Sequence, residues 1–213
     1  MSTLMRAKKE CGSWFWDLNE TVPSGLDSAL GVAARIIGVL DQFELLSPSG
    51  LECMWLAPGK GFTGVMSTVF IQNLADPDIP NKLSGSRPAA FPEAKIRDFA
   101  VIGSGVWYDA EWRPRKEPRL VDLSVTTSSY GPTATVSVHH DVWSWFSFSG
   151  RPHPEVQSRN APRLADALRG INSTLGVEAE TGEPTYFGHA VDFGISTPDA
   201  DESGLGPDLT DKL

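Results

Sequence analysis

One cluster of side chains could move protons or hold a metal ion: His139-His140-Asp141. Imidazole and carboxylate groups serve proteins as general acids and bases and as ligands of transition metals. The three residues end a predicted strand, and neighbouring residues of a strand point to opposite faces. The two imidazoles therefore cannot share one metal ion unless the strand bulges. We expect His140 to be a hydrogen-bonded core or rim residue in register with Val136 and Val138, and His139 to be exposed.

A glycine-rich segment, GKGFTG at residues 59–64, matches the dinucleotide-binding pattern G-x-G-x-x-G and follows a predicted strand. That chemistry needs a helix N-terminus directly after the glycines, where the pyrophosphate binds. Residues 65–71 are instead β-branched and aromatic, which favours a strand. We interpret the segment as a hairpin loop, and no cofactor or metal is expected for the chain.

The chain contains seven tryptophans, and three of them lie beside charged or polar turns: Trp112, Trp143 and Trp145. A partly exposed aromatic patch is the usual material of binding hot spots. These three residues are therefore candidates for binding a partner, with core packing as the alternative because a tryptophan buries a large area.

The net charge of −9 is unevenly distributed along the chain. Residues 178–213 hold nine acids and one base, whereas the other residues hold 18 acids and 17 bases. Such an acidic segment repels nucleic acids and attracts basic proteins. Its acids are either a solubilising tail or a recognition surface, and four of them are the candidate partner-binding acids: Glu178, Glu180, Glu183 and Asp192.

These side chains need a scaffold, and hydrophobic periodicity predicts one. Alternating apolar residues and turn signals predict strands over 12–18, 51–57, 65–74, 96–107 and 120–128. The strand over 96–107 should have a bulge or bend at 103–105. The strand over 120–128 should pair with the segment that follows the turn at 130–132. Residues 76–92 read as a long loop with four prolines. Helical spacing predicts two helices, over 26–43 with Ser24 or Asp27 as the N-cap and over 160–175 with Asn160 as the N-cap. The expected fold class is α+β, a mainly antiparallel twisted sheet of about five to seven strands with two amphipathic helices packed on it.

The second helix gives the sharpest packing prediction. Its apolar stripe should be buried against the sheet, namely Leu164, Leu168, Ile171 and Leu175. Its charged residues should face water, namely Arg163, Asp166 and Arg169.

Composition predicts the domain organisation and excludes several classes of protein. We expect a flexible N-terminus over 1–11, a single α+β domain over 12–196 and an acidic flexible tail over 197–213. The cysteines, Cys11 and Cys53, are too few for a disulfide scaffold or a four-cysteine zinc site. No apolar run is long enough for a signal peptide or a membrane span, so a cytoplasmic location without membrane contact is expected.

An aromatic first strand, Trp14-Phe15-Trp16, is followed at once by the long amphipathic helix and then by a tryptophan-bearing antiparallel sheet. This order of elements resembles the immunity proteins of bacterial polymorphic toxin systems. The resemblance covers about 35 residues at the start of the chain. It implies a small, cytoplasmic, often acidic, non-enzymatic protein that binds one toxin tightly, frequently a basic nuclease.

The leading functional hypothesis is thus a non-enzymatic binding protein, an immunity protein that neutralises a cognate toxin, such as a nuclease, by occluding its active site. One alternative is a small α+β enzyme or metal-binding protein that uses His139, His140 and Asp141. A further alternative is a structural or scaffolding component of an assembly, which predicts self-association. The sequence leaves the oligomeric state open.

Overall fold

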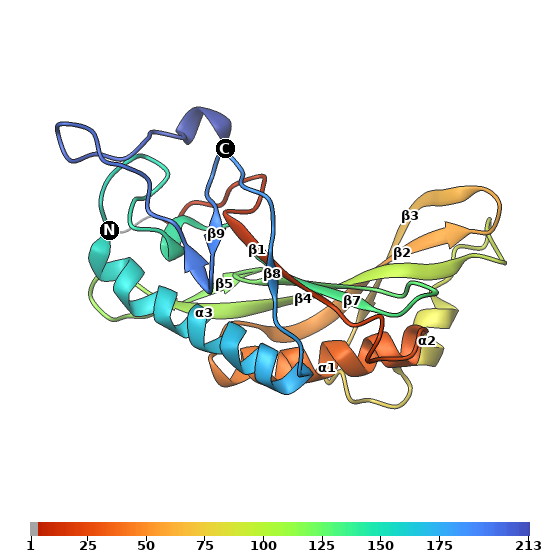
Figure 1. The fold of residues 1–213 in the computed structure, drawn as a ribbon. Coiled ribbons are helices and arrows are strands. Elements are labelled where there is room, and N and C mark those ends of the chain that lie inside the picture. The colour runs from red at the N-terminus through yellow and green to blue at the C-terminus, as the bar shows by residue number, and fades with distance from the viewer. Residues whose placement is uncertain (1–3) are drawn as a thin grey trace.

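The computed structural model describes residues 4–213 and has the expected α+β class, with three α-helices and a sheet of eight antiparallel strands (Figure 1). The helices are α1 (Leu26–Gln42), α2 (Ile79–Gly85) and α3 (Pro154–Leu175), and the two 3₁₀-helices are η1 (Asp141–Trp143) and η2 (Thr210–Lys212). The strands of the large sheet are β1 (Gly12–Asp17), β2 (Ser47–Ala57), β3 (Gly61–Phe70), β4 (Lys95–Tyr108), β5 (Pro114–Pro118), β6 (Asp122–Thr126), β7 (Thr133–Val138) and β8 (Glu180–Thr181). A separate two-stranded sheet consists of β9 (Ala190–Val191) and β10 (Gly194–Ile195).

The strand order of the large sheet is β3-β2-β4-β6-β7-β1-β8, with β5 paired to the second half of β4. The eight strands exceed the expected five to seven because β5 and β8 give no strand signal. β5 has the sequence PRKEP, which is compatible with a sheet only at an edge, where proline need not donate to a ladder. β8 is only two residues long.

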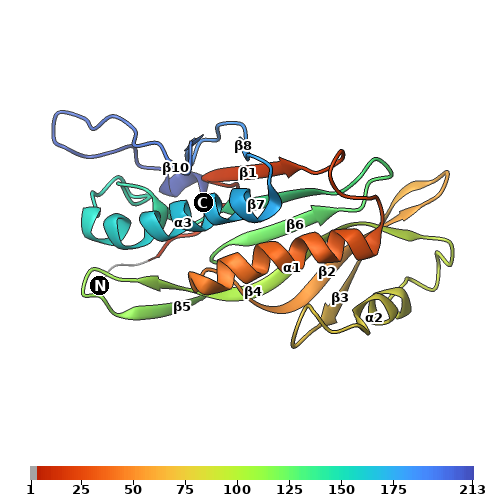
Figure 2. The same cartoon turned by 60° about the horizontal axis from the view of Figure 1, so that its bottom comes forward.

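Helices α1 and α3 pack side by side on one face of the sheet, and no described helix covers the central strands on the other face (Figures 1 and 2). The predicted alternation places the core on the helical side. Trp14 and Trp16 of β1 lie on the same face as Val136 of β7, which pairs with Trp14, and all three are completely buried. Phe15, which lies between the two tryptophans and points to the opposite face of the sheet, is half-buried.

Helix α1 begins and packs as its periodicity predicts, but its cap differs. The apolar spacing predicts a buried stripe of Leu26, Leu30, Ala33, Ile37 and Leu40, and all of these are buried except Leu26, which is half-buried at the first turn. The N-cap is Gly25, with a φ of 121° and no side-chain hydrogen bond, and not Ser24 or Asp27. Glycine fits this position because its lack of a Cβ atom tolerates a positive φ.

Helix α3 begins six residues before the predicted start, at Pro154, and includes Pro162 inside it. Asn160 is therefore not an N-cap. It is completely buried, and its side-chain amide donates to Tyr108 O and its Oδ1 accepts from Tyr108 N, both over 2.9 Å. The amide thus continues the hydrogen-bonding pattern on the side of β4 opposite β5, where neither β2 nor β6 reaches Tyr108. Gly176 ends the helix in the left-handed conformation, as expected.

The predicted buried stripe of α3 is confirmed, since Leu164, Leu168, Ile171 and Leu175 are all buried. Arg163 does not face water as predicted. Its guanidinium is half-buried and donates to Val106 O over 2.8 Å and to Phe43 O. It therefore joins α3 to β4 and to the end of α1.

The glycine-rich segment joins β2 to β3 as a hairpin, as predicted, with positive φ at Gly59, Gly61 and Gly64. The following segment, expected to be a loop over 76–92, contains α2, whose buried Ile79 and Leu83 provide apolar anchors that the proline content obscured. The bulge or bend predicted at residues 103–105 of β4 lies instead in the partner strand, where Ser49 of β2 is the extra residue between the pairs Pro48–Gly103 and Gly50–Ile102.

Both terminal segments make main-chain contacts with the domain. Ala7 N–H donates to His139 O over 2.7 Å, and Leu209 N–H donates to Phe148 O over the same distance. The expected division into a flexible 1–11, a domain over 12–196 and a flexible 197–213 stays a prediction, and residues 1–3 lie outside the described part. Among the helices of residues 4–213, none is both long and apolar enough to cross a membrane.

Candidate functional site

The histidine cluster lies in an extended segment directly after β7. Residues 5–7 pair along this segment, so that Arg6 forms a β-bridge with His140. As predicted, His140 is buried in register with the core side chains of β7, but neither of its ring nitrogens has a hydrogen-bond partner among the described residues. His139 is half-buried and not exposed as predicted, because the paired N-terminal segment runs alongside it. The two imidazoles contact different acids: His139 Nε2 lies 3.5 Å from an oxygen of Asp122, and His140 Nε2 lies 3.7 Å from an oxygen of Glu117.

Burial controls the ionisation of this cluster. Burial, with a smaller contribution from the nearby Arg6 guanidinium, lowers the pKa of His140 to about 4. Burial raises the pKa of Asp141 to about 6, although the carboxylate accepts hydrogen bonds from Met5 N over 3.1 Å and Phe148 N over 3.3 Å. A buried carboxylate with two main-chain donors ties these segments together, which is a structural role.

The cluster does not form a catalytic or metal-binding arrangement. The Asp141 carboxylate is bonded to main-chain donors, and the contacts of the two imidazoles lie elsewhere. Within residues 4–213, no group of three or more His, Cys, Asp or Glu side chains is placed to hold a metal ion. The geometry therefore gives no support to the enzyme alternative.

A charged network at Asp122 was not anticipated from the sequence. Its carboxylate accepts from Arg6 over 2.8 Å and lies 3.7 Å from Arg119, which also pairs with Glu52. Arg6 lies 116 positions away in the sequence, so local patterns give no signal for this contact. Because each of these charges has an opposite partner, the network stabilises the join between the N-terminal segment, β2 and β6 and leaves no charge free for a ligand.

The three candidate tryptophans divide between surface and core. Trp112 is 62% exposed and Trp145 is 41% exposed, but Trp143 is buried in η1 and is not available to a partner. Trp143 follows the alternative of core packing, because one turn of 3₁₀-helix directs it inward between polar neighbours. Trp112 lies in the β4–β5 turn, where the Arg159 guanidinium lies 4.7 Å from its ring centre.

Three of the four candidate acids meet at one place. Glu178, Glu180 and Asp192 line an open groove of about 670 Å³, between β8 and the β9–β10 hairpin, and Glu183 is exposed but does not line it. No lysine or arginine lines this acidic groove. None of the four carboxylates forms an ion pair within the described residues, and the Glu178 carboxylate accepts a hydrogen bond from the side-chain amide of Asn172.

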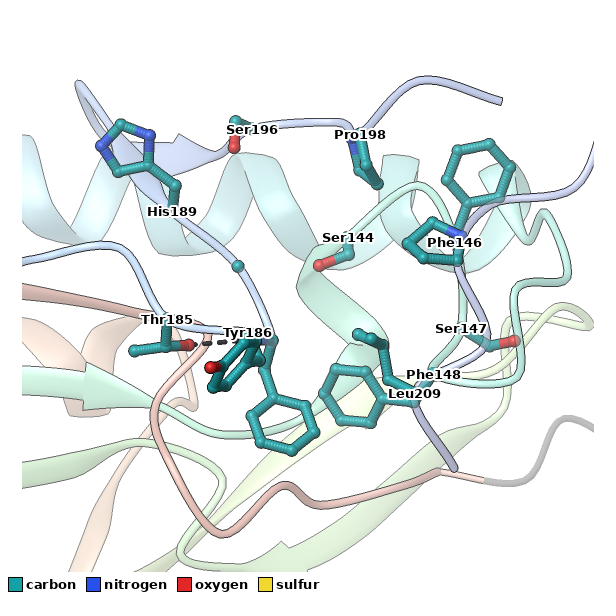
Figure 3. Close-up of a pocket in the computed structure, with 13 residues that line it drawn as sticks. Ser144, Phe146, Ser147, Phe148, Thr185, Tyr186, His189, Ser196, Pro198 and Leu209 are labelled. Carbon is teal, nitrogen blue, oxygen red and sulfur yellow. Dashed lines mark hydrogen bonds between the residues drawn. The ribbon is translucent and has the colours of Figure 1, made fainter. Parts of the chain in front are cut away.

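An aromatic pocket of about 220 Å³ lies beside the acidic groove (Figure 3). Residues from three segments face one another around it, 144–148, 185–189 and 196–209. The rings of Phe148 and Phe187 meet edge to face with their centres 5.3 Å apart, and Leu209 closes part of the wall. Tyr186 is 73% exposed at the rim, with Lys212 Nζ 4.5 Å from its ring centre.

The acidic groove and the aromatic pocket share one lining residue, His189. Together they form one composite surface, apolar on one side and acidic on the other. The sequence indicated the acids but not the pocket, because the expected tail over 197–213 provides one of its walls. One signal in the sequence could have indicated the pocket. Aromatic residues occur in pairs at 146 and 148 and at 186 and 187, within segments rich in glycine and serine.

Comparison with known proteins does not assign this surface. The chain matches no protein-family model, no curated protein and no solved structure at a significant level.

Proposed function

We propose that this chain is a non-enzymatic binding protein for a basic protein partner, and that it acts as an immunity protein that neutralises a cognate toxin. The observation that carries the proposal is the composite surface, in which unpaired carboxylates adjoin an aromatic pocket at His189. Binding hot spots combine an apolar anchor in a pocket with a polar surround. The surface fits a partner segment with an apolar side chain flanked by lysine or arginine.

The mechanism is occlusion of the toxin's active site. A nuclease needs basic groups to bind the phosphates of its substrate, and the acidic groove is complementary to such groups. Glu178, Glu180 and Asp192 would occupy the place of the phosphates, while the aromatic pocket fixes the register of the complex. A nuclease toxin is therefore the proposed partner class, and the bacterial cytoplasm is the proposed location.

The first experiment asks whether the partner exists. The full chain is used as bait against the proteins encoded beside its gene, and each candidate is then expressed in cells with and without this chain. We expect one basic partner to be retained and its toxicity to be suppressed. If no neighbour is retained and no toxicity is suppressed, the immunity proposal is wrong.

The second experiment tests the surface. The double variant Glu180→Lys with Asp192→Lys should lose binding and rescue, because it reverses the charge of the acidic groove. The control is Glu20→Lys with Glu93→Lys, which makes the same change in net charge at two exposed acids elsewhere. Equal loss in both variants would show that net charge, and not this surface, governs recognition.

A further inference from the structure

The sheet has strand edges of very different character. Within residues 4–213, three strands of the large sheet pair on one side only, namely β3, β5 and β8. β5 has a proline at each end and three charged residues between them, and β8 is two residues long, one of them the acid Glu180. Proline, charge and shortness are the usual means of preventing an edge strand from pairing. β3 has ten residues with no charge and no proline, so its edge is unprotected.

The straight part of this edge is short and well defined. β3 pairs with β2 in unbroken register from Phe70, opposite Gly50, to Met66, opposite Met54. The register then shifts beside Gly64, whose φ is 71°. Because such an irregularity bends a strand and interrupts pairing, residues 66–70 are the part of β3 that can accept another strand.

This straight segment displays large apolar side chains. Phe70 is 79% exposed and Met66 is 59% exposed, and neighbouring Met54 of β2 is 43% exposed. Met66 and Met54 are paired across the two strands and so lie on the same face of the sheet. Apolar side chains gathered beside a free strand edge are typical of an interaction surface.

We propose that the protein forms a twofold-symmetric dimer through antiparallel pairing of residues 66–70 with the same segment of a second copy, centred on Thr68. In this register Met66 of one copy faces Phe70 of the other, and the two Thr68 residues face each other. The exposed apolar side chains cover each other at both ends, and a threonine pair at the centre is favourable. The free main-chain groups of both edges gain partners.

Charge does not oppose a second copy at this edge, and the sequence of the edge favours one. Two molecules with a net charge of −9 repel each other over most of their surfaces, but residues 66–70 bring no formal charge to the contact. The charged side chain paired across from Thr68 within the protein is Glu52, and Arg119 already neutralises it. The sequence MSTVF, apolar at both ends with threonine at the centre, is also complementary to itself when antiparallel.

The dimer does not compete with the composite surface. β3 and β8 lie at opposite ends of the sheet, so the acidic groove of each copy stays open. The dimer proposal and the immunity proposal therefore stand or fall independently.

The test combines sedimentation with cross-linking on the full chain. We expect sedimentation equilibrium to give the mass of two chains, and Thr68→Cys to form an intermolecular disulfide under mild oxidation. The native cysteines are buried, and burial raises the pKa of Cys53 to about 12, so the unchanged protein should not cross-link. The matched control is Ser173→Cys, on the exposed surface of α3, which should also stay uncross-linked.

A charge placed on the axis provides the second measurement. Thr68→Lys brings two like charges face to face, so we expect the sedimenting mass to fall to one chain while the circular dichroism spectrum stays unchanged. The melting temperature should fall and lose its dependence on protein concentration, because dimer formation no longer stabilises the folded chain. Ser173→Lys should remain a dimer. The proposal is overturned if the unchanged protein sediments as one chain, if Thr68→Lys remains a dimer, or if Ser173→Cys cross-links and Thr68→Cys does not.

Discussion

Burial acts in opposite directions on two neighbouring side chains, His140 and Asp141. The folded protein holds His140 at a pKa of about 4, below the usual 6.5, because burial disfavours the imidazolium. It holds Asp141 at a pKa of about 6, above the usual 3.8, because burial disfavours the carboxylate. As pH falls from 6.5 to 4, the unfolded chain binds the histidine proton first and the folded state is destabilised. As pH falls from 6 to 3.8, the folded chain binds the aspartate proton first and is stabilised.

These two contributions nearly cancel in the unchanged protein, and single variants should separate them. Each corresponds to about 3 kcal/mol at 1.36 kcal/mol per pKa unit. His140→Gln retains only the aspartate contribution, so acidification from pH 6.5 to 4 should raise its free energy of unfolding relative to the unchanged protein. Asp141→Asn retains only the histidine contribution, and its relative free energy should fall over the same range. Urea unfolding at several pH values measures both.

The control for this pair is Ser173→Ala, an exposed change that removes no ionisable group. Its free energy of unfolding should follow that of the unchanged protein at every pH. If all three variants give parallel curves, burial does not control the ionisation of His140 and Asp141 as described.

Single polar residues were the hardest feature to predict from the sequence. Asn160 is of a residue type that commonly caps helices and stands before an apolar helical stripe. Its side chain instead forms hydrogen bonds with the main chain of Tyr108, 52 positions away. Arg163 looks like a surface residue of α3, but its donors reach main-chain oxygens of two other elements. Local propensity contains no information about such distant acceptors, so the tertiary contact decides the outcome.

Elements with strong periodicity were predictable, and weak ones were not. The amphipathic stripes of α1 and α3 and the alternation of β1, β6 and β7 give the correct type and the correct buried face, because burial of one face is what selects these patterns. The short α2 and the edge strands β5 and β8 are set by their neighbours. Their own residues offer proline, charge or too few positions for a pattern.

The packing of α3 against the sheet gives a prediction at this scale. Leu168 is completely buried, so Leu168→Ala should lower the free energy of unfolding by about 2–5 kcal/mol through the lost contacts and the cavity. Arg169 is the next residue, and its side chain is 57% exposed. Arg169→Ala should therefore change the free energy of unfolding by no more than about 0.5 kcal/mol. Urea unfolding compares them. Equal shifts of the two midpoints would mean that α3 does not pack on the sheet through Leu168.

At the scale of the whole molecule, the two candidate interaction surfaces lie at opposite ends of one sheet. The uncharged edge of β3 lies at one end, and the acidic composite surface beyond β8 lies at the other. Although the chain has a net charge of −9, its uncharged strand edge lies far from the acidic groove, so a second copy can approach that edge. The sequence indicated the acidic end from composition, but the β3 edge depends on strand order, which composition does not contain.

The C-terminal segment links this organisation to stability. Composition predicts a flexible tail over residues 197–213. Leu209 of this segment packs against the core, and Gly206 N–H donates to Gly150 O over 2.8 Å. Removing residues 197–213 would expose the buried Phe146 and Phe148 and open the aromatic pocket. We therefore expect the chain ending at residue 196 to unfold at a lower urea concentration and to lose partner binding. Glu202→Ala, an exposed change inside the segment, should leave both properties unchanged. If the shortened and full chains unfold at the same urea concentration, the segment is the flexible tail that its composition predicts, and the pocket does not depend on it.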